Sequence, residues 1–171
     1  LNIHGHGDDA YAGQGVVFEA LALANLKNYS IGGTIHFVTN NQLGFTATMS
    51  ETRSGRYCTD IVKSFGIPVL HVNAFDVEAV TKVCKLAVRY KKKFMKDIML
   101  DMISFRKYGH NEVDEPSFTQ PEMYEKIRNT PSIYTQYKDK LLNEGAIKQN
   151  TIDNITKKFT EWWENEFEAS T

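Results

Sequence analysis

The chain has 171 residues, with 20 Lys and Arg against 21 Asp and Glu and a formal net charge of −1. This length suits one domain with a real core, and the balanced charge gives no bulk electrostatic footprint for nucleic acid. Because no run of about 20 apolar residues occurs, we expect no membrane-spanning helix. The cysteines, Cys58 and Cys84, lack metal-ligand spacing, so we expect free thiols in a reducing compartment.

The first third of the chain predicts a strand, a helix and a second strand. Leu1-Asn2-Ile3-His4 has the character of the middle or end of a strand with no lead-in and no initiator Met, so we expect a piece of a larger protein. Residues 13–27 predict a helix that is apolar almost all round and covered on several sides. Residues 34–38 are β-branched and apolar, which favours a buried parallel strand. The expected core stripe of the helix is Phe18, Leu21 and Ala22.

The middle of the chain continues the alternation. Residues 42–56 are polar and predict a long functional loop. A short helix is expected at 58–64, then a strand at 68–72 and a helix with Asp76 as its N-cap. Apolar residues recur in that helix at helical spacing, and three lysines lie near its end, where they complement the dipole. A strand at 98–104 completes the order β-α-β-α-β-α-β, so we predict an α/β fold with a parallel sheet flanked by helices.

The character changes after the last predicted strand. Residues 105–121 lack apolar periodicity and predict a second loop at a strand's carboxyl end. Amphipathic helices follow Pro121, and we expect Trp162 and Trp163 to anchor the last one in the core or at a subunit contact. We therefore predict a diphosphate- and Mg²⁺-binding α/β domain over residues 1–120 and a helical extension over 121–171. The extension would pack on that domain or link it to a missing one.

Two oxygen-bearing side chains point to a magnesium site. Asp8 ends the first predicted strand and Asn41 follows the second, 33 residues later. The carboxyl ends of neighbouring parallel strands meet at one edge of a sheet, where ligands bind in open α/β folds. Hard oxygen donors suit Mg²⁺ that also holds a diphosphate, and a helix start attracts phosphate. Taken singly, Asp8 could be a helix cap and Asn40-Asn41 a turn pair.

The same residues carry a family resemblance over roughly residues 3–145. The chain resembles thiamine diphosphate enzymes, whose signature is Gly-Asp-Gly followed by Asn-Asn. The spacer between the two parts of the signature is similar in length to the segment between Asp8 and Asn41 here. Within them it is similar to the decarboxylating dehydrogenase component of 2-oxoglutarate dehydrogenase complexes and to its 2-oxoadipate counterpart. Ile31-Gly32-Gly33 and Tyr57-Cys58 lean toward the 2-oxoadipate type. The supporting strings are His6-Gly7-Asp8, Gly13-Gln14-Gly15, Val38-Thr39-Asn40-Asn41-Gln42-Leu43-Gly44-Phe45-Thr46, Gly109-His110-Asn111-Glu112-Val113-Asp114-Glu115-Pro116 and Thr119-Gln120-Pro121-Glu122-Met123-Tyr124.

The resemblance implies particular ligands. Asp8 and Asn41 would bind Mg²⁺ through their side chains, Leu43 would add its main-chain carbonyl, and the ion would bridge the two phosphates of thiamine diphosphate. This chain has Asp9 where the family usually has a small residue. A carboxylate beside a diphosphate is repulsive unless it points away or the helix start compensates, so Asp9 puts cofactor affinity in question.

The histidines have several readings. The resemblance implies that His110 lies at the entrance of the site and serves proton transfer or lipoyl acceptance; the alternative is a histidine that orders its loop by bonding carboxylates such as Glu112. His4-x-His6-x-Asp8 invites a transition-metal reading, but it is a weak signal. We expect His4 and His6 to line the cofactor pocket instead. His36 and His71 are expected to be satisfied core histidines.

The expected function follows from the resemblance. It implies an oxidoreductase that decarboxylates 2-oxoglutarate or 2-oxoadipate and passes the acyl group to a lipoyl-bearing acyltransferase subunit. It also implies a homodimer, located in the mitochondrial matrix of eukaryotes. Nothing here matches the Glu that activates the cofactor in the family's other half, so we expect this chain alone not to turn over substrate. Two alternatives stay open, a transketolase-like thiamine enzyme and a non-catalytic assembly module.

Overall fold

The computed structural model describes residues 1–170. The chain separates into two compact units, one from Leu1 to Thr130 and one from Pro131 to the end of the described chain. The first unit carries every strand, and the second is helical. The division that we expect at residue 120 between a diphosphate-binding domain and an extension remains a prediction.

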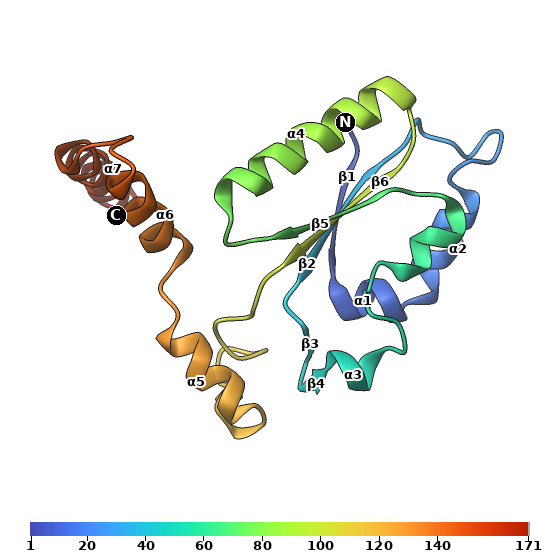
Figure 1. Cartoon of the computed structure of the whole chain (residues 1–171), viewed down its shortest axis with the longest axis horizontal. Coiled ribbons are helices and arrows are strands. Elements are labelled where there is room, and N and C mark those ends of the chain that lie inside the picture. Colours follow the sequence, from blue (N-terminus) through green and yellow to red (C-terminus); the bar gives the residue numbers. More distant parts are fainter. Residues whose placement is uncertain (171) are drawn as a thin grey trace. The chain divides into compact units, whose positions relative to one another are not determined.

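A four-stranded parallel sheet organises the first unit (Figure 1). Its order is β1 (Ile3–Gly7), β2 (Ile35–Asn40), β6 (Ile98–Ile103) and β5 (Val69–Asn73). All three strand pairings are parallel, so the carboxyl ends of the strands share one edge of the sheet. The predicted α/β class and the order of strands and helices are therefore confirmed. The three strands with predicted bounds, β2, β5 and β6, lie within two residues of them, because short apolar runs between turn signals mark strands well.

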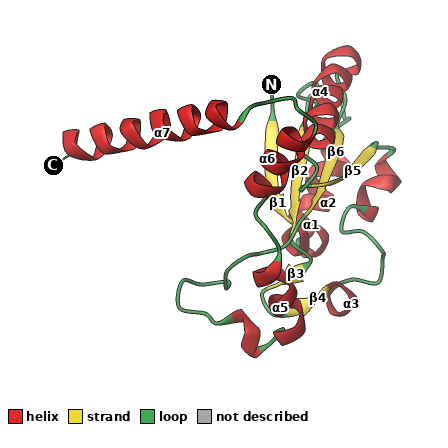
Figure 2. Ribbon diagram, turned by 60° about the vertical axis from the view of Figure 1, so that its left-hand side comes forward, coloured by secondary structure: helices red, strands yellow, loops and turns green. Residues whose placement is uncertain are grey.

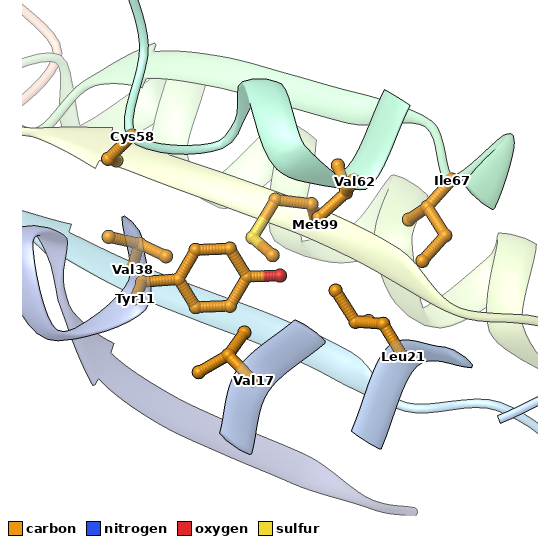
Figure 3. Close-up of a cluster of buried hydrophobic side chains, with 8 residues drawn as sticks. All are labelled: Tyr11, Val17, Leu21, Val38, Cys58, Val62, Ile67 and Met99. Atoms are coloured by element: carbon orange, nitrogen blue, oxygen red, sulfur yellow. The ribbon is translucent and has the colours of Figure 1, made fainter. Parts of the chain in front are cut away.

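Helices cover both faces of the sheet. On one face lie α1 (Asp8–Gly13), α2 (Gly15–Leu23) and the 3₁₀ helix η1 (Asp60–Phe65), which bury a core against β2 and β6 (Figure 3). On the other face α4 (Val77–Phe94) packs against strand residues Ile35, Ile98 and Leu100. The first core contains Tyr11, Val17, Leu21, Val38, Cys58, Val62, Ile67 and Met99.

The helix α4 follows the sequence expectation closely. Asp76 caps its first turn by accepting a hydrogen bond from the Ala79 N–H at 2.9 Å. Cys84 faces the core on this helix, and the three lysines fall in its last turn. Lys91 is nonetheless buried, which a long aliphatic stem permits. Both cysteines are free thiols, as expected.

The single helix expected at 13–27 is wrong in two respects. The helical segment begins at Asp8 and is interrupted at Gln14, whose extended backbone (φ −90°, ψ 116°) separates α1 from α2. The expected core residue Phe18 is 50% exposed, and its ring packs edge-on against Phe65 at 5.1 Å. Ala22 is exposed as well, whereas the expected Leu21 is buried, together with Val17. The sequence of this helix is apolar almost all round, so its periodicity does not show which face packs against the sheet.

The predicted loop 42–56 contains short elements. β3 (Leu43–Gly44) pairs antiparallel with β4 (Ala47–Thr48), and α3 (Met49–Thr52) follows. A capping box fixes that helical turn: the Thr48 N–H donates to the Glu51 carboxylate at 2.7 Å, while the Thr48 side chain caps in return. Further along, η2 (Pro116–Phe118) interrupts the second predicted loop and leads into α5 (Pro121–Asn129).

The second unit consists of α6 (Ile133–Asn143) and α7 (Gln149–Ala169), shown as red helices in Figure 2. Ile152 is the one buried residue of α7 among those described. Trp162 and Trp163 are 52% and 57% exposed, so the expectation that they anchor the helix in a core is wrong. A subunit contact at these rings stays a prediction. None of the helices in the described chain has the length and apolar character needed to cross a membrane.

Candidate functional site

Asp8 lies at the junction between β1 and α1. It is 2% exposed, and its Oδ2 has no hydrogen-bond partner. Burial is the main reason that the pKa of Asp8 is raised above 3.8, and the neighbouring Asp9 raises it further. The charge of Arg53 and the N–H of Asn41 lower the pKa of Asp8. The carboxylate of Asp8 therefore lies close to Asn41, the residue that follows β2. A buried anionic oxygen without a partner is costly unless a cation or proton compensates it.

A tight turn follows β2. Two successive side chains fold back on their own backbone: the Gln42 N–H donates to Asn40 Oδ1 at 3.2 Å, and the Leu43 N–H donates to Asn41 Oδ1 at 3.0 Å. Gln42 has a positive φ of 68° in this turn, a conformation that is uncommon outside glycine. Each amide oxygen keeps a second lone pair, so Asn41 can still ligate an ion.

The unexpected carboxylate, Asp9, is held away from open solvent by two neighbours. Its Oδ1 lies 3.5 Å from Arg53 Nη1, and the same nitrogen lies 3.6 Å from Asp8 Oδ2. A Cβ on Gly44 would meet Asp9 Oδ2 at 1.2 Å, so a side chain there would displace the carboxylate that rests on β3. The Arg53 side chain is 7% exposed, and its Nε and Nη2 have no partners. The positive charge of Arg53 therefore compensates the carboxylates of Asp8 and Asp9, and its Nε and Nη2 groups can still donate hydrogen bonds.

A hydrogen-bond network around Asp101 holds the turn at Asn40–Leu43 in place. Asp101 on β6 is fully buried, and its Oδ1 accepts a hydrogen bond from Asn40 Nδ2 at 3.0 Å. Its Oδ2 lies 2.8 Å from Nδ1 of His71 on β5, and the Tyr57 ring covers that imidazole at 4.0 Å. The expectation that His71 is satisfied is confirmed, but its place in the core is wrong, because the residue is exposed. Through Asn40, the carboxylate of Asp101 fixes the backbone from which Asn41 and Leu43 extend.

His110 lies in the exposed loop after β6. Its ring meets the Phe45 ring edge-on at 4.7 Å, two residues beyond Leu43. Arg106 Nη2 donates to the Phe45 carbonyl at 2.9 Å and Arg106 Nε donates to Tyr124 Oη at 3.2 Å, so the loop is tied to the turn and to α5. A cavity of about 280 Å³ opens here, lined by Phe45, Thr46, Arg106, His110, Val113, Asp114, Glu115, Pro116, Phe118 and Thr119. Glu112 does not line it, and among the described contacts it holds no bond to His110.

His4, His6 and His36 gather on the face of the sheet that bears α1. His6 and His36 stack at 5.7 Å, and burial together with the other two imidazoles lowers the pKa of His6. The expectation that His36 is satisfied is wrong, because its Nδ1 is buried without a partner. Its Nε2 faces Asp97 at 3.8 Å.

The parallel sheet thus carries a buried carboxylate (Asp8), an Asn-Asn turn and a loop histidine (His110) at one edge. The profile of the "Dehydrogenase E1 component" family matches residues 1–171 of this chain. The chain belongs to the dehydrogenase E1 component family. This family depends on thiamine diphosphate. The resemblance read from the sequence motifs is thereby confirmed at the level of the family.

Individual relatives of this E1 chain agree. It is 54% identical over 144 residues to "2-oxoglutarate dehydrogenase, mitochondrial" of Dictyostelium discoideum, covering 84% of this chain and 14% of that protein. It is 48% identical over 166 residues to a "Probable 2-oxoadipate dehydrogenase complex component E1 homolog" of the same organism, covering 97% and 18%. The E1 component of Bacillus subtilis 2-oxoglutarate dehydrogenase is 44% identical over 163 residues, covering 95% and 17%. The E1 chain thus spans less than a fifth of each of these relatives.

Two residues of this candidate site, Arg53 and Asp101, were not predicted from the sequence. Arg53 sits in a polar segment, and nothing local distinguishes it from a solvated arginine. Asp101 did leave a signal, since a carboxylate within the apolar run Ile98–Ile103 must be buried and paired. Its partners on β2 and β5 are far away in sequence, so only the sheet order identifies them.

Proposed function

We propose that this chain binds Mg²⁺ and the diphosphate of thiamine diphosphate at the carboxyl edge of its sheet. It would do so as part of a 2-oxo acid dehydrogenase that decarboxylates 2-oxoglutarate or 2-oxoadipate. The observation that carries the proposal is the buried Asp8 Oδ2, which has no hydrogen-bond partner and lies beside the Asn41–Leu43 turn. Carboxylate, amide and carbonyl oxygens are the donors that Mg²⁺ prefers.

Each residue has a role in this proposal. Asp8, Asn41 and the Leu43 carbonyl hold the ion, and Arg53 balances Asp8 and Asp9 so that two carboxylates can flank an anionic diphosphate. Asp9 is a cofactor-site residue through its contact with Gly44, not a metal ligand. When bound, thiamine diphosphate supplies an electron sink for the carbanion left by loss of CO₂. His110 borders the cavity and can give or take a proton near neutral pH, or receive the lipoyl group.

The wider assignments belong to the same proposal. The acyl group would pass to lipoamide on an acyltransferase subunit, and the enzyme would act as a homodimer. Relatives named for 2-oxoglutarate and for 2-oxoadipate are similarly close, so both substrates are kept. Two relatives are named mitochondrial, which supports the mitochondrial matrix in a eukaryotic source. Parallel decarboxylation assays with both oxo acids test the substrate; we expect the 171-residue chain alone to show no turnover, and clear turnover would contradict this expectation.

Cofactor binding is tested by calorimetric titration of the chain with thiamine diphosphate and Mg²⁺. We expect binding that requires both components and that weakens at least about tenfold in Asp8→Asn, because the charged ligand is lost. Asp139→Asn removes a carboxylate on α6, which is 55% exposed, and should leave binding unchanged. Absence of binding by the wild-type chain would favour the assembly-module alternative. Equal affinity in Asp8→Asn and Asp139→Asn would remove Asp8 from the site.

A further inference from the structure

We propose that His4, His6 and His36 form a second metal site, for a divalent transition ion of the Zn²⁺ type. This site is separate from the oxygen-rich site at Asp8. Three imidazole nitrogens suit a borderline ion such as Zn²⁺, whereas Mg²⁺ prefers oxygen ligands. The two sites would therefore select different ions from the same solution.

The sheet brings the three rings together. His4 and His6 alternate along β1 and so point to the same face, and the register pairs His4 with His36 on β2. Ring centroids lie 6.2 Å apart for His4 and His6 and 5.7 Å apart for each pair that includes His36. One ligand nitrogen from each ring can be chosen so that all lie within 4.8 Å of one another. Tetrahedral Zn²⁺ with bonds near 2.0 Å needs nitrogens about 3.4 Å apart, a closure within reach because His4 is exposed and can turn.

Unpartnered polar atoms mark the same place. His36 is 8% exposed and its Nδ1 has no hydrogen-bond partner, and neither does the buried Nε2 of His6. The hydroxyl of Tyr11, whose ring packs edge-on against His6 at 4.8 Å, is also buried without a partner. Buried polar atoms are nearly always paired, so this concentration of unpaired ones around three imidazoles favours a ligand-binding position there.

Asp97 provides the orientation that metal-binding histidines need. Its Oδ1 accepts a hydrogen bond from the Thr34 N–H at 2.6 Å and lies 3.8 Å from His36 Nε2. This arrangement favours a proton on Nε2 and leaves the lone pair of Nδ1 free for a metal. A carboxylate behind the distal nitrogen of a ligating imidazole is the usual partner in zinc sites. Three protein ligands would leave the fourth position to water or to a bound anion.

The test is a Zn²⁺ titration of the metal-free full chain in excess Mg²⁺, read by competition with a chromophoric chelator. We expect one equivalent of Zn²⁺ to bind. Co²⁺ in its place should give the intense visible absorbance of tetrahedral coordination. His4→Gln should weaken Zn²⁺ binding at least about tenfold, and as an exposed side chain it can be replaced without unfolding the sheet. Zn²⁺ should also raise the melting temperature of the wild-type chain more than that of His4→Gln.

Two control variants separate this site from its neighbours. His110→Gln removes an exposed histidine outside the cluster, and Asp8→Asn removes the carboxylate of the magnesium site; both should bind Zn²⁺ with wild-type affinity. Substoichiometric binding, or equal affinity in His4→Gln and His110→Gln, would overturn the proposal. Loss of Zn²⁺ binding in Asp8→Asn would overturn it as well, because the ion would then be at the carboxylate.

Discussion

Nη1 of Arg53 lies 3.6 Å from Oδ2 of Asp8. Both side chains are almost completely buried, and the same nitrogen lies 3.5 Å from Asp9. A single guanidinium thus compensates two adjacent carboxylates at the edge of the sheet where we place a metal. Arg53 is therefore a fixed cation beside the position at which we propose that Mg²⁺ binds.

Replacement of Arg53 by methionine should destabilise the metal-free chain by about 2 kcal/mol, because it leaves two buried or half-buried carboxylates uncompensated. Mg²⁺ should then raise the melting temperature more in Arg53→Met than in the wild type, since the ion takes over the lost compensation. Thermal unfolding with and without Mg²⁺ measures both effects.

Arg128→Met provides the matched control. Arg128 pairs with Glu115 at 2.6 Å, but both side chains are about half exposed. Such a pair contributes less than about 1 kcal/mol, and its loss should not change the response to Mg²⁺. An equal response of the two variants to Mg²⁺ would contradict the role assigned to Arg53.

Asp101→Ala should be among the most damaging single changes in the first unit. It leaves the amide of Asn40 and the imidazole of His71 without their common partner in a buried place, at a cost of about 3 kcal/mol. Asp101→Asn should cost less, because one oxygen remains to accept the bond from Asn40. Urea unfolding of both variants, and of each combined with His71→Ala, gives the coupling between the two residues. Additive effects would mean that the 2.8 Å contact carries no stability.

Asp60 gives stability a defined pH dependence. The contact with Lys63, whose Nζ lies 2.6 Å from Asp60 Oδ1, and a hydrogen bond from the Tyr57 N–H lower the pKa of Asp60 below 3.8. Because the folded pKa is depressed, the contribution is present above pH 3.8 and is lost as the pH falls through the lowered value. Asp60→Asn should therefore be less stable than the wild type by less than about 1 kcal/mol at pH 7, and the gap should close on acidification. A gap that is constant between pH 7 and pH 3 would refute this assignment.

Cys58 should be chemically inert in the folded chain. It is 1% exposed, and burial followed by the charge of Asp101 raises its pKa to about 12. At pH 8 the thiolate fraction is then about 10³-fold lower than for an ordinary thiol, so iodoacetamide should modify Cys58 only after unfolding. Mass spectrometry of peptides from native and urea-treated protein reads the modification of Cys58 and Cys84 separately. Rapid modification of Cys58 in the native chain would show that the core opens there.

The sequence predicted the sheet much better than the helices beside it. Asp76 marked the start of α4 correctly, because an N-cap is a local chemical device. Phe18 was placed in the core wrongly, because an almost uniformly apolar helix does not reveal which side the sheet will cover. His36 was expected to have its hydrogen bonds satisfied, but its Nδ1 has no partner. This outcome depends on the residues that β1 places beside it, which the local sequence does not reveal.

By itself the sequence determined the α/β class, the family and the two polar segments that end β1 and β2, since these follow from short-range periodicity and from motifs whose residues are close in the chain. Only the tertiary structure decided that Arg53 lies against Asp8 and Asp9, that Asp101 joins Asn40 to His71, and that three histidines share one face. These relationships depend on strand order and register. Pairing between strands brings together residues that are distant in sequence, and no local pattern in the chain records which ones will meet.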